Sequence, residues 1–310
     1  MSDSRPLVSI VVPSFNQGRY IEETLKSCLT QSYRPIEVFV QDGGSTDNTV
    51  SILKSFETPE MRWVSEPDEG VVDAVNKGLS KAKGDILSIQ SSDDVFVAGA
   101  IEVAVDSLSE DPTVGLVYGD VELIDEESRV TGIDIQGPFD LTMYFGRFMY
   151  IPQPGTFFTR VALEAAEGWR SEVSYAADAD FWLRIALRYP VCKLNRVMAR
   201  YRYHPLQRDR QQASICRDWE KMIADLLANF ELDSRTRRYA RSGIFLARHR
   251  YTNSQHWWPR TKALYGAVLA NPAVLTQPGF PKRELFPGRD PIWKQLSRAK
   301  QALGLKPRGT

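Results

Sequence analysis

The sequence has few of the residues that build a disulfide framework or a zinc site. It contains three cysteines, Cys28, Cys192 and Cys216, in 310 residues. They are far apart, odd in number and outside any spacing used for metal ligands, which argues against a disulfide-rich secreted protein. We therefore expect free, mostly buried thiols in a reducing compartment.

Long apolar runs are missing as well. No run approaches the length needed to cross a bilayer, and the start, MSDSRPLVSIVVPSF, has no extended apolar region after basic residues. These absences predict a cytoplasmic protein, which can still bind the inner face of the membrane peripherally. A Gly-x-Gly-x-x-Gly turn after the first strand-like run is also absent, which argues against a dinucleotide-dependent dehydrogenase.

Charge is balanced overall but uneven along the chain. From Arg235 to Thr310 there are 16 Lys and Arg against 2 acidic residues, a balance of +14, and the earlier part carries −14. A length of 310 residues indicates one large domain with an appendage. We place the boundary near Arg210, which separates residues 1–210 from a basic, mainly helical region at 211–310.

Strand-like and helix-like segments alternate in the first half of the chain. A β-rich run at residues 7–12 is followed by a polar turn and by apolar residues at helical spacing. The same order repeats at residues 36–56 and again at residues 62–82. Consecutive units of this kind predict a parallel α/β sheet. Residues 114–133 form a hairpin pattern, so an antiparallel element should join the sheet.

The stretch GDILSIQSSDDV at residues 84–95 is central to this organisation. Its apolar run predicts a buried strand, and Asp93 and Asp94 follow directly. In an open α/β sheet, ligands bind at the carboxyl ends of the strands, and paired carboxylates there suit a hard divalent cation. The alternative is that Asp94 caps a helix at residues 98–108.

Three spaced blocks resemble one enzyme family. They are VSIVVPSFNQGRYIEETLKSCLTQSYRPIEVFVQDGGSTDNTV, EPDEGVVDAVNKGLSKAKGDILSIQSSDD and AADADFWLRIA. Together they resemble family 2 glycosyltransferases, above all bacterial members that build surface polysaccharides. The resemblance covers residues 7–205. It implies a GT-A fold, an open, mostly parallel sheet flanked by helices, and an inverting transfer of a sugar from a nucleotide diphosphate to an acceptor hydroxyl.

The resemblance also implies which residues hold the nucleoside. Asp42 matches such a position, and a carboxylate can accept a hydrogen bond from N3–H of uracil, which favours a UDP-sugar donor. The alternative for Asp42 is an Asx-turn in its Asp-Gly-Gly loop. Asn76 is expected to face the donor, whereas Asp73 can equally be a helix N-terminal charge. The remaining matching positions are Pro13, Ser14, Phe15 and Asn16.

Asp93 and Asp94 match the family's Asp-x-Asp region, which implies Mn²⁺ or Mg²⁺. The resemblance favours Asp94 for the cation and Asp93 for the cation or the ribose of the donor. His204 falls where some relatives place a metal-contacting histidine, although a structural role is the alternative. Ser91 departs from the pattern, because many relatives have the first acid there.

Asp178 matches the family's catalytic base. Two residues apart on a helix do not share a face, so Asp178 and Asp180 should not both serve the site, and one of them is expected to be a cap or a structural acid. Gln153 and Pro154 lie in the stretch that usually borders the acceptor pocket.

Two other functions are alternatives to sugar transfer. A sugar-phosphate nucleotidyltransferase would need a Gly-rich, basic first loop, which is absent here. A catalytically impaired nucleotide-sugar or glycan-binding protein of the same fold is the stronger alternative, because of Ser91. The basic C-terminal region contains Trp257, Trp258 and Trp293, which suits an anionic membrane surface. Packing on the acidic N-terminal part or dimerisation would explain it equally.

Overall fold

The computed structural model describes residues 5–56, 58–205, 207–208, 211–252 and 256–285. By residue contacts the chain forms two compact units. The N-terminal unit comprises Met1–Tyr144 and Met149–Met222, and the C-terminal unit comprises Phe145–Phe148 and Ile223–Thr310. The division by contacts falls inside helix α8 (Gln212–Asn229), whereas Arg210, near which the sequence places the boundary, lies outside the described residues, so that boundary stays a prediction.

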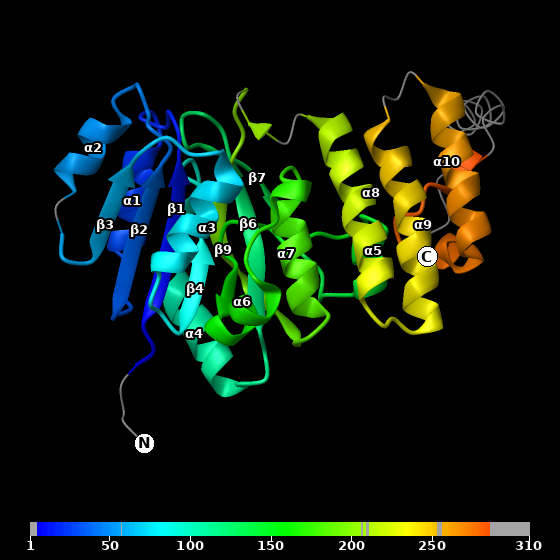
Figure 1. The fold of residues 1–310 in the computed structure, drawn as a ribbon, viewed down its shortest axis with the longest axis horizontal. Coiled ribbons are helices and arrows are strands. Elements are labelled where there is room, and N and C mark those ends of the chain that lie inside the picture. The colour runs from blue at the N-terminus through cyan, green and yellow to red at the C-terminus, as the bar shows by residue number, and fades with distance from the viewer. Residues whose placement is uncertain (1–4, 57, 206, 209–210, 253–255, 286–310) are drawn as a thin grey trace, which may run out of the picture. The chain divides into compact units, whose positions relative to one another are not determined.

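The N-terminal unit is built on one sheet with the order β3-β2-β1-β4-β8-β6-β9-β5, and β7 pairs with β6 at the side (Figure 1). Its first four strands are parallel, since each of the first three is followed by a helix that returns the chain to the same end of the sheet. These strands are β1 (Val8–Ser14), β2 (Ile36–Asp42), β3 (Met61–Ser65) and β4 (Ile86–Ile89), with helices α1 (Ile21–Leu29), α2 (Thr49–Ser55) and α3 (Val71–Lys81) between them.

The second half of the sheet is mixed. The predicted hairpin is confirmed, since β6 (Leu116–Ile124) pairs antiparallel with β7 (Val130–Asp134). Strand β9 (Val191–Arg202) pairs parallel with β6, and β8 (Phe157–Thr159) joins β4 to β6. The two-residue strand β5 (Val95–Phe96) pairs with the end of β9. The expected fold class, a mostly parallel α/β sheet with an antiparallel addition, is therefore confirmed.

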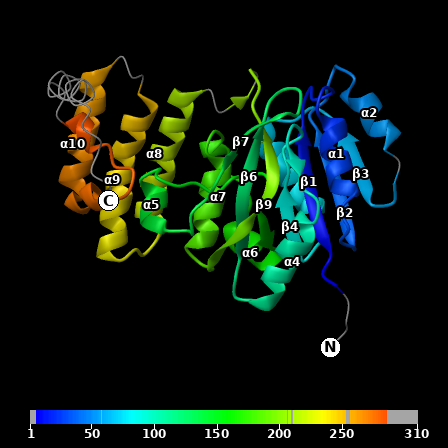
Figure 2. The ribbon, with the colours of Figure 1, turned by 180° about the vertical axis from the view of Figure 1, so that it is seen from behind.

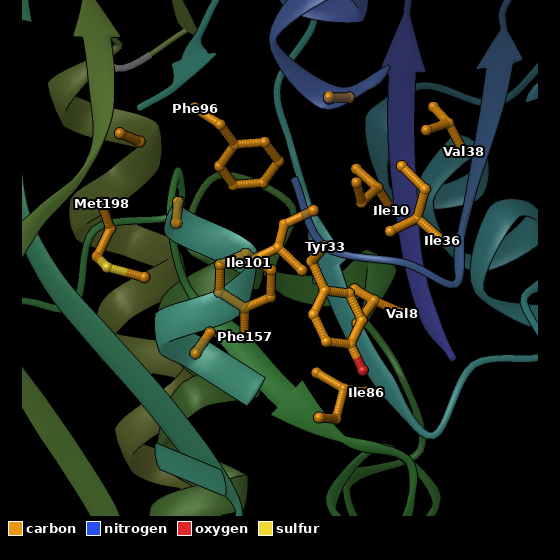
Figure 3. Close-up of a cluster of buried hydrophobic side chains, with 14 of the residues drawn as sticks. Val8, Ile10, Tyr33, Ile36, Val38, Ile86, Phe96, Ile101, Phe157 and Met198 are labelled. Atoms are coloured by element: carbon orange, nitrogen blue, oxygen red, sulfur yellow. The ribbon is translucent and has the colours of Figure 1, made fainter. Parts of the chain in front are cut away.

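The core lies on one face of this sheet. Alternate residues of β1, among them Val8 and Ile10, point to this face, where they meet α1 and α4 (Ala100–Glu110). Figure 3 shows Val8, Ile10 and Ile101 in this cluster, with Phe96 and Phe157. Helix α3 covers the opposite face so closely that a Cβ on Gly78 would come within 2.3 Å of Val11. The strands are therefore buried on both faces, as their apolar sequence predicts.

Three further helices belong to this part of the chain. Helix α6 (Arg160–Ala166) begins at Thr159, whose hydroxyl accepts a hydrogen bond from the backbone of Ala162. Helix α7 (Ala177–Ala186) is largely buried, and a 3₁₀ turn at Ser171–Val173 precedes it. Helix α5 (Leu141–Phe145) ends where the C-terminal unit takes over the chain.

The C-terminal unit is helical, as expected. Helices α9 (Ser234–Tyr251) and α10 (Trp257–Ala270) lie side by side in both views (Figures 1 and 2). Asp233 caps α9 by accepting hydrogen bonds from two backbone N–H groups. Two 3₁₀ turns follow, at Pro272–Thr276 and Lys282–Leu285. None of the helices in the described ranges is long and apolar enough to span a bilayer.

Candidate active site

The loops at the carboxyl ends of β1, β2 and β3 are tied together by hydrogen bonds. The Asn16 backbone N–H donates to Ser45 Oγ at 2.7 Å, and Ser45 Oγ donates to Asp42 Oδ1 at 2.5 Å. Ser65 Oγ donates to Asp42 Oδ2 at 2.7 Å. The backbone N–H of Ser45 also donates to Asp42 Oδ2 at 2.9 Å, which is one residue further along the chain than the bond of an Asx-turn. The fully buried Asp42 carboxylate thus holds the loops in shape.

The other residues predicted to bind the nucleoside, Pro13 to Asn16, lie at the end of β1 and in the turn after it. Pro13 and Ser14 end β1 in buried positions, whereas the Phe15 side chain is 57% exposed. Asn16 has a φ of 52°, and its Oδ1 accepts a hydrogen bond from the Thr46 backbone. Asparagine tolerates this left-handed conformation better than most residues. The chain therefore turns sharply after β1 and leaves an aromatic ring exposed at the sheet edge.

Two predicted metal residues from distant parts of the sequence lie together. His204 Nε2 is 2.8 Å from Asp93 Oδ2, and both side chains are mostly buried. The Tyr20 ring packs against the imidazole, with 5.2 Å between the ring centroids. A carboxylate and an imidazole are ligands that Mn²⁺ accepts. The described residues contain no cluster of three such ligands, so a cation here would need oxygen atoms from a substrate as well.

Asp94 lies deeper than Asp93. Its Oδ1 accepts the backbone N–H of Arg202 at 2.9 Å, and its carbonyl accepts Thr24 Oγ1 at 2.8 Å. The side chain is fully buried. The capping alternative is wrong, because the N-cap of α4 is Gly99. Asp94 thus joins the loop to the end of β9, an arrangement that favours Asp93 over Asp94 as the group next to a ligand.

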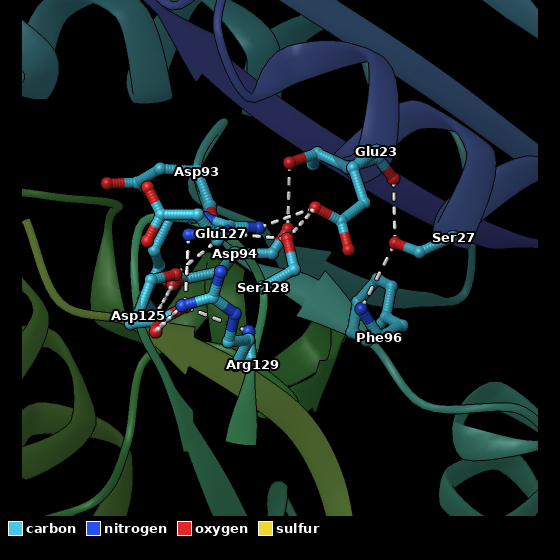
Figure 4. A network of polar contacts seen from close by, with 11 residues as sticks. Glu23, Ser27, Asp93, Asp94, Phe96, Asp125, Glu127, Ser128 and Arg129 are labelled. Atoms are coloured by element: carbon cyan, nitrogen blue, oxygen red, sulfur yellow. Dashed lines mark hydrogen bonds and ion pairs between the residues drawn. The ribbon is translucent and has the colours of Figure 1, made fainter. Parts of the chain in front are cut away.

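Arg202, which the sequence analysis does not name as a site residue, is central to a network of hydrogen bonds around the Asp93 loop. This completely buried side chain donates from Nε to the Asp93 carbonyl at 2.8 Å and from Nη2 to Glu23 Oε2 at 2.7 Å. Its Nη1 reaches the Asp125 carbonyl and Ser128 Oγ. Figure 4 shows Asp93 and Asp94 beside Glu23 and Ser128 in this network. One guanidinium thus joins α1, the Asp93 loop, the β6–β7 turn and β9. A charged residue inside a β-rich run was the available signal.

Ser91, which replaces the usual first acid, is engaged by Gln153. Ser91 Oγ donates to Gln153 Oε1 at 2.6 Å, and Gln153 Nε2 donates to the carbonyl of Ile89 at 2.6 Å. Pro154 is buried beside it. The segment expected to border the acceptor pocket is therefore fixed against the end of β4.

The Asn76 side chain, which was expected to face the donor, bonds to the backbone of Trp169, and its role towards a donor stays a prediction. Its Nδ2 donates to the Trp169 carbonyl at 2.8 Å, and its Oδ1 accepts the Trp169 N–H at 2.9 Å. Both ends of the amide are thus used to hold a backbone segment. Asp73 acts as a helix N-terminal charge, because it accepts the Glu69 N–H and pairs with Lys77 at 2.8 Å.

The two acids of α7 have different surroundings. Asp180 is buried and binds Arg170 and Arg184, with its Oδ2 2.8 Å from Arg184 Nε. Burial lowers the pKa of Arg184, and the Asp180 charge opposes that shift. Asp178 lies half-buried in the first turn and is not the cap, since the N-cap is Ala176. Asp180 is therefore the structural acid of the pair, and the role of Asp178 as base stays a prediction.

Comparison with known proteins agrees with this architecture. The family model for glycosyl transferase family 2 matches residues 9–162. An uncharacterized glycosyltransferase of Mycobacterium tuberculosis is 31% identical over 261 residues, which cover 82% of this chain and 96% of the relative. A chondroitin synthase of Escherichia coli is 29% identical over 194 residues, covering 62% of this chain but 28% of that protein.

Two solved structures have similar folds. TarS of S. aureus, in complex with UDP-GlcNAc, superposes with a TM-score of 0.65 at 15% identity, covering 85% of this chain and 81% of that one. The mannosyltransferase PcManGT of Pyrobaculum calidifontis, with GDP-Man and Mn²⁺, gives 0.63 at 22% identity, covering 98% and 82%. At these identities the likeness concerns the fold alone.

Proposed function

Since this chain belongs to glycosyl transferase family 2, we propose that it is an inverting enzyme that transfers a sugar from a nucleotide diphosphate to an acceptor hydroxyl. The acceptor is a glycan or a lipid-linked glycan in surface polysaccharide assembly. The observation that carries the proposal is the meeting of Asp93 and His204, 2.8 Å apart, at the end of the parallel strands. That sheet edge is where α/β proteins bind nucleotides.

The donor binds, in this proposal, along the loops after β1 and β2. Phe15 and Asn16 contact the nucleoside from the turn, and Asp42 keeps that turn in shape through Ser45 and Ser65. UDP is the favoured nucleotide. The fold neighbours were solved with both UDP-GlcNAc and GDP-Man, so the choice of base depends on this chain's own loop.

Asp93 and His204 fit a divalent cation that also binds the donor diphosphate. Mg²⁺ and Mn²⁺ commonly use one or two protein ligands together with phosphate oxygens. When bound, such a cation offsets the negative charge that develops on the departing nucleoside diphosphate. Arg202 fixes the Asp93 carbonyl, and the Tyr20 ring supports His204, so both ligands are held before the donor arrives.

Asp178 is the general base of the proposed reaction. Its carboxylate removes the proton of the acceptor hydroxyl as that oxygen attacks the anomeric carbon opposite the nucleotide, which inverts the configuration. The ion pairs of Asp180 with Arg170 and Arg184 fix the turn of α7 that presents Asp178.

The substitution Asp178→Asn tests this role. Asn keeps the size but cannot take a proton, so transfer should fall by about a hundredfold to ten thousandfold in kcat. Donor affinity should not change. Asp73→Asn is the matched control. Asp73 also lies in the first turn of a helix, but it forms an ion pair with Lys77 and accepts a hydrogen bond from the Glu69 backbone. Near wild-type transfer by Asp178→Asn would remove the base assignment.

A catalytically impaired sugar-binding protein is the second candidate, favoured by the Ser91–Gln153 bond in place of an acid. Donor turnover with and without Mn²⁺, in wild type and Asp93→Asn, separates the two. An enzyme should turn over donor with Mn²⁺ and lose this activity in the variant. Donor binding without any turnover would favour the second candidate.

A further inference from the structure

Helix α10 is apolar on two opposite faces. Its inner face buries Ala263, Leu264 and Ala267. Its outer face exposes Trp258 (58%), Tyr265 (44%) and Leu269 (84%), which recur at helical spacing. A helix on the surface of a globular protein normally places polar residues on its outer side. The outer face of α10 therefore has the composition expected of a surface that contacts an apolar partner.

Positive charge accompanies this outer face. Lys262 is exposed between Trp258 and Tyr265, and no acidic residue occurs in α10. In the described part of the C-terminal unit there are 11 Lys and Arg against 4 Asp and Glu, a balance of +7. Two of the four acids have local tasks, since Asp233 caps α9 and Glu284 pairs with Arg260.

Helix α9 adds arginines next to α10. Its exposed Arg238, Arg241 and Arg248 share one side of the helix with Phe245. Phe245 in turn lies against α10, because a Cβ on Gly266 would come within 2.5 Å of its ring. The arginine side of α9 thus adjoins α10, and the two helices offer basic, aromatic and aliphatic side chains together.

We propose that this surface, formed by Arg238, Arg241 and Arg248 of α9 and Trp258, Lys262, Tyr265 and Leu269 of α10, docks on an anionic lipid bilayer. Trp and Tyr favour the membrane interface, where their rings are apolar and their polar atoms stay wet. Lys and Arg are attracted by anionic headgroups. Tyr265 is suited to this position, because its hydroxyl donates to the Leu285 carbonyl at 2.7 Å and its ring stays exposed.

Charge complementarity selects the bilayer over other occupants. In a symmetric contact, a second copy of the chain would bring the same positive charge to this surface. A nucleic acid would bind the arginines but would leave Leu269, more exposed than Trp258 and Tyr265, without an apolar partner. The docking surface contains no residue of the candidate active site. A variant can therefore lose membrane binding and keep sugar transfer, or the reverse.

Flotation of the full chain with vesicles tests the proposal. We expect binding to phosphatidylcholine vesicles that contain about a third phosphatidylserine, weak binding to phosphatidylcholine alone, and release in high salt. Arg238→Glu with Arg241→Glu should weaken binding at least about 25-fold, about fivefold for each charge removed. The control is Lys54→Glu with Arg62→Glu, which changes net charge equally on exposed positions of the N-terminal unit and should bind as wild type.

Leu269→Ser tests the apolar part. It should weaken binding several-fold and leave the melting temperature unchanged, whereas Val161→Ser, at a position 59% exposed in α6, should change neither. Absence of vesicle binding in low salt would overturn the proposal, as would equal loss in the two charge-reversal variants. A drop of several degrees in melting temperature on Leu269→Ser would also overturn it, because the face would then be covered within the chain or by a second copy.

Discussion

Replacing Asp180 by Asn should destabilise the N-terminal unit far more than the same change at Asp178. Asp180 is buried between Arg170 and Arg184, and Arg184 is itself mostly buried. Asn keeps the volume but removes the charge that both guanidinium groups bind. Breaking a buried ion pair from one side costs about 3–5 kcal/mol. Arg170 is 31% exposed and contributes less than Arg184, because solvent screens it.

This loss is a large part of a typical stability of about 5–15 kcal/mol. For a unit of this size it corresponds to a fall of about 6–20 °C in melting temperature, at about 2–4 °C per kcal/mol. Urea unfolding and calorimetry of both variants measure it. Asp178→Asn should lose at most about 1 kcal/mol, since that side chain is half-buried and lies in the first turn of α7, where a negative charge contributes about 0.3–1 kcal/mol. An Asp180→Asn protein within 1 kcal/mol of wild type would refute the structural role of Asp180.

Three further outcomes follow from buried groups. Arg202→Met should cost at least about 1.5–3 kcal/mol in urea unfolding, the contribution of one hydrogen bond to a charged group, and weaken donor binding, because the buried guanidinium holds four segments; unchanged donor affinity would contradict this role. Burial raises the pKa of Cys28 to about 12, so alkylation at pH 8 followed by mass spectrometry should find this thiol protected in the native protein and the other two modified. Burial lowers the pKa of His249 from its usual 6.5, so the unfolded chain binds the proton more readily. The contribution of His249 to the free energy of unfolding should therefore be constant above about pH 6.5. Below that pH the free energy of unfolding should fall, by at most about 1.4 kcal/mol per pH unit. His249→Gln should flatten that slope in thermal scans, and an identical slope would reject the account.

The sheet could be predicted because its information is local. The apolar runs of β1, β2 and β4 and the helical spacing between them specify the parallel half without reference to distant residues. The strand β5 was not predicted, because two residues are too few to show the alternating apolar pattern of a strand. Because β5 occupies residues 95 and 96, the next helix begins at Ala100, later than predicted, and its N-cap is Gly99 instead of Asp94.

The site was predictable in residue types but not in partners. Sequence and family likeness drew attention to Asp93, His204 and Asp180, yet nothing local shows that His204 meets Asp93. The same limit applies to Asn76, whose amide was expected to face the donor. Its partner, the backbone of Trp169, lies 93 residues further along the chain. Hydrogen bonds of this kind depend on how distant segments pack together, and the hydrophobic periodicity of the sequence does not predict that packing.

The buried guanidinium of Arg202 also has a consequence for the order in which the molecule forms. Its partners lie 179 residues away at Glu23, 109 at Asp93 and 77 at Asp125, so closing these loops costs entropy that local contacts do not repay. Chains fold from the N-terminus as they leave the ribosome. The residues of the four parallel strands are therefore all synthesised before residue 202. A nascent chain that stops short of Arg202 contains the residues of the parallel strands and of the Asp93 loop but lacks the guanidinium that binds this loop.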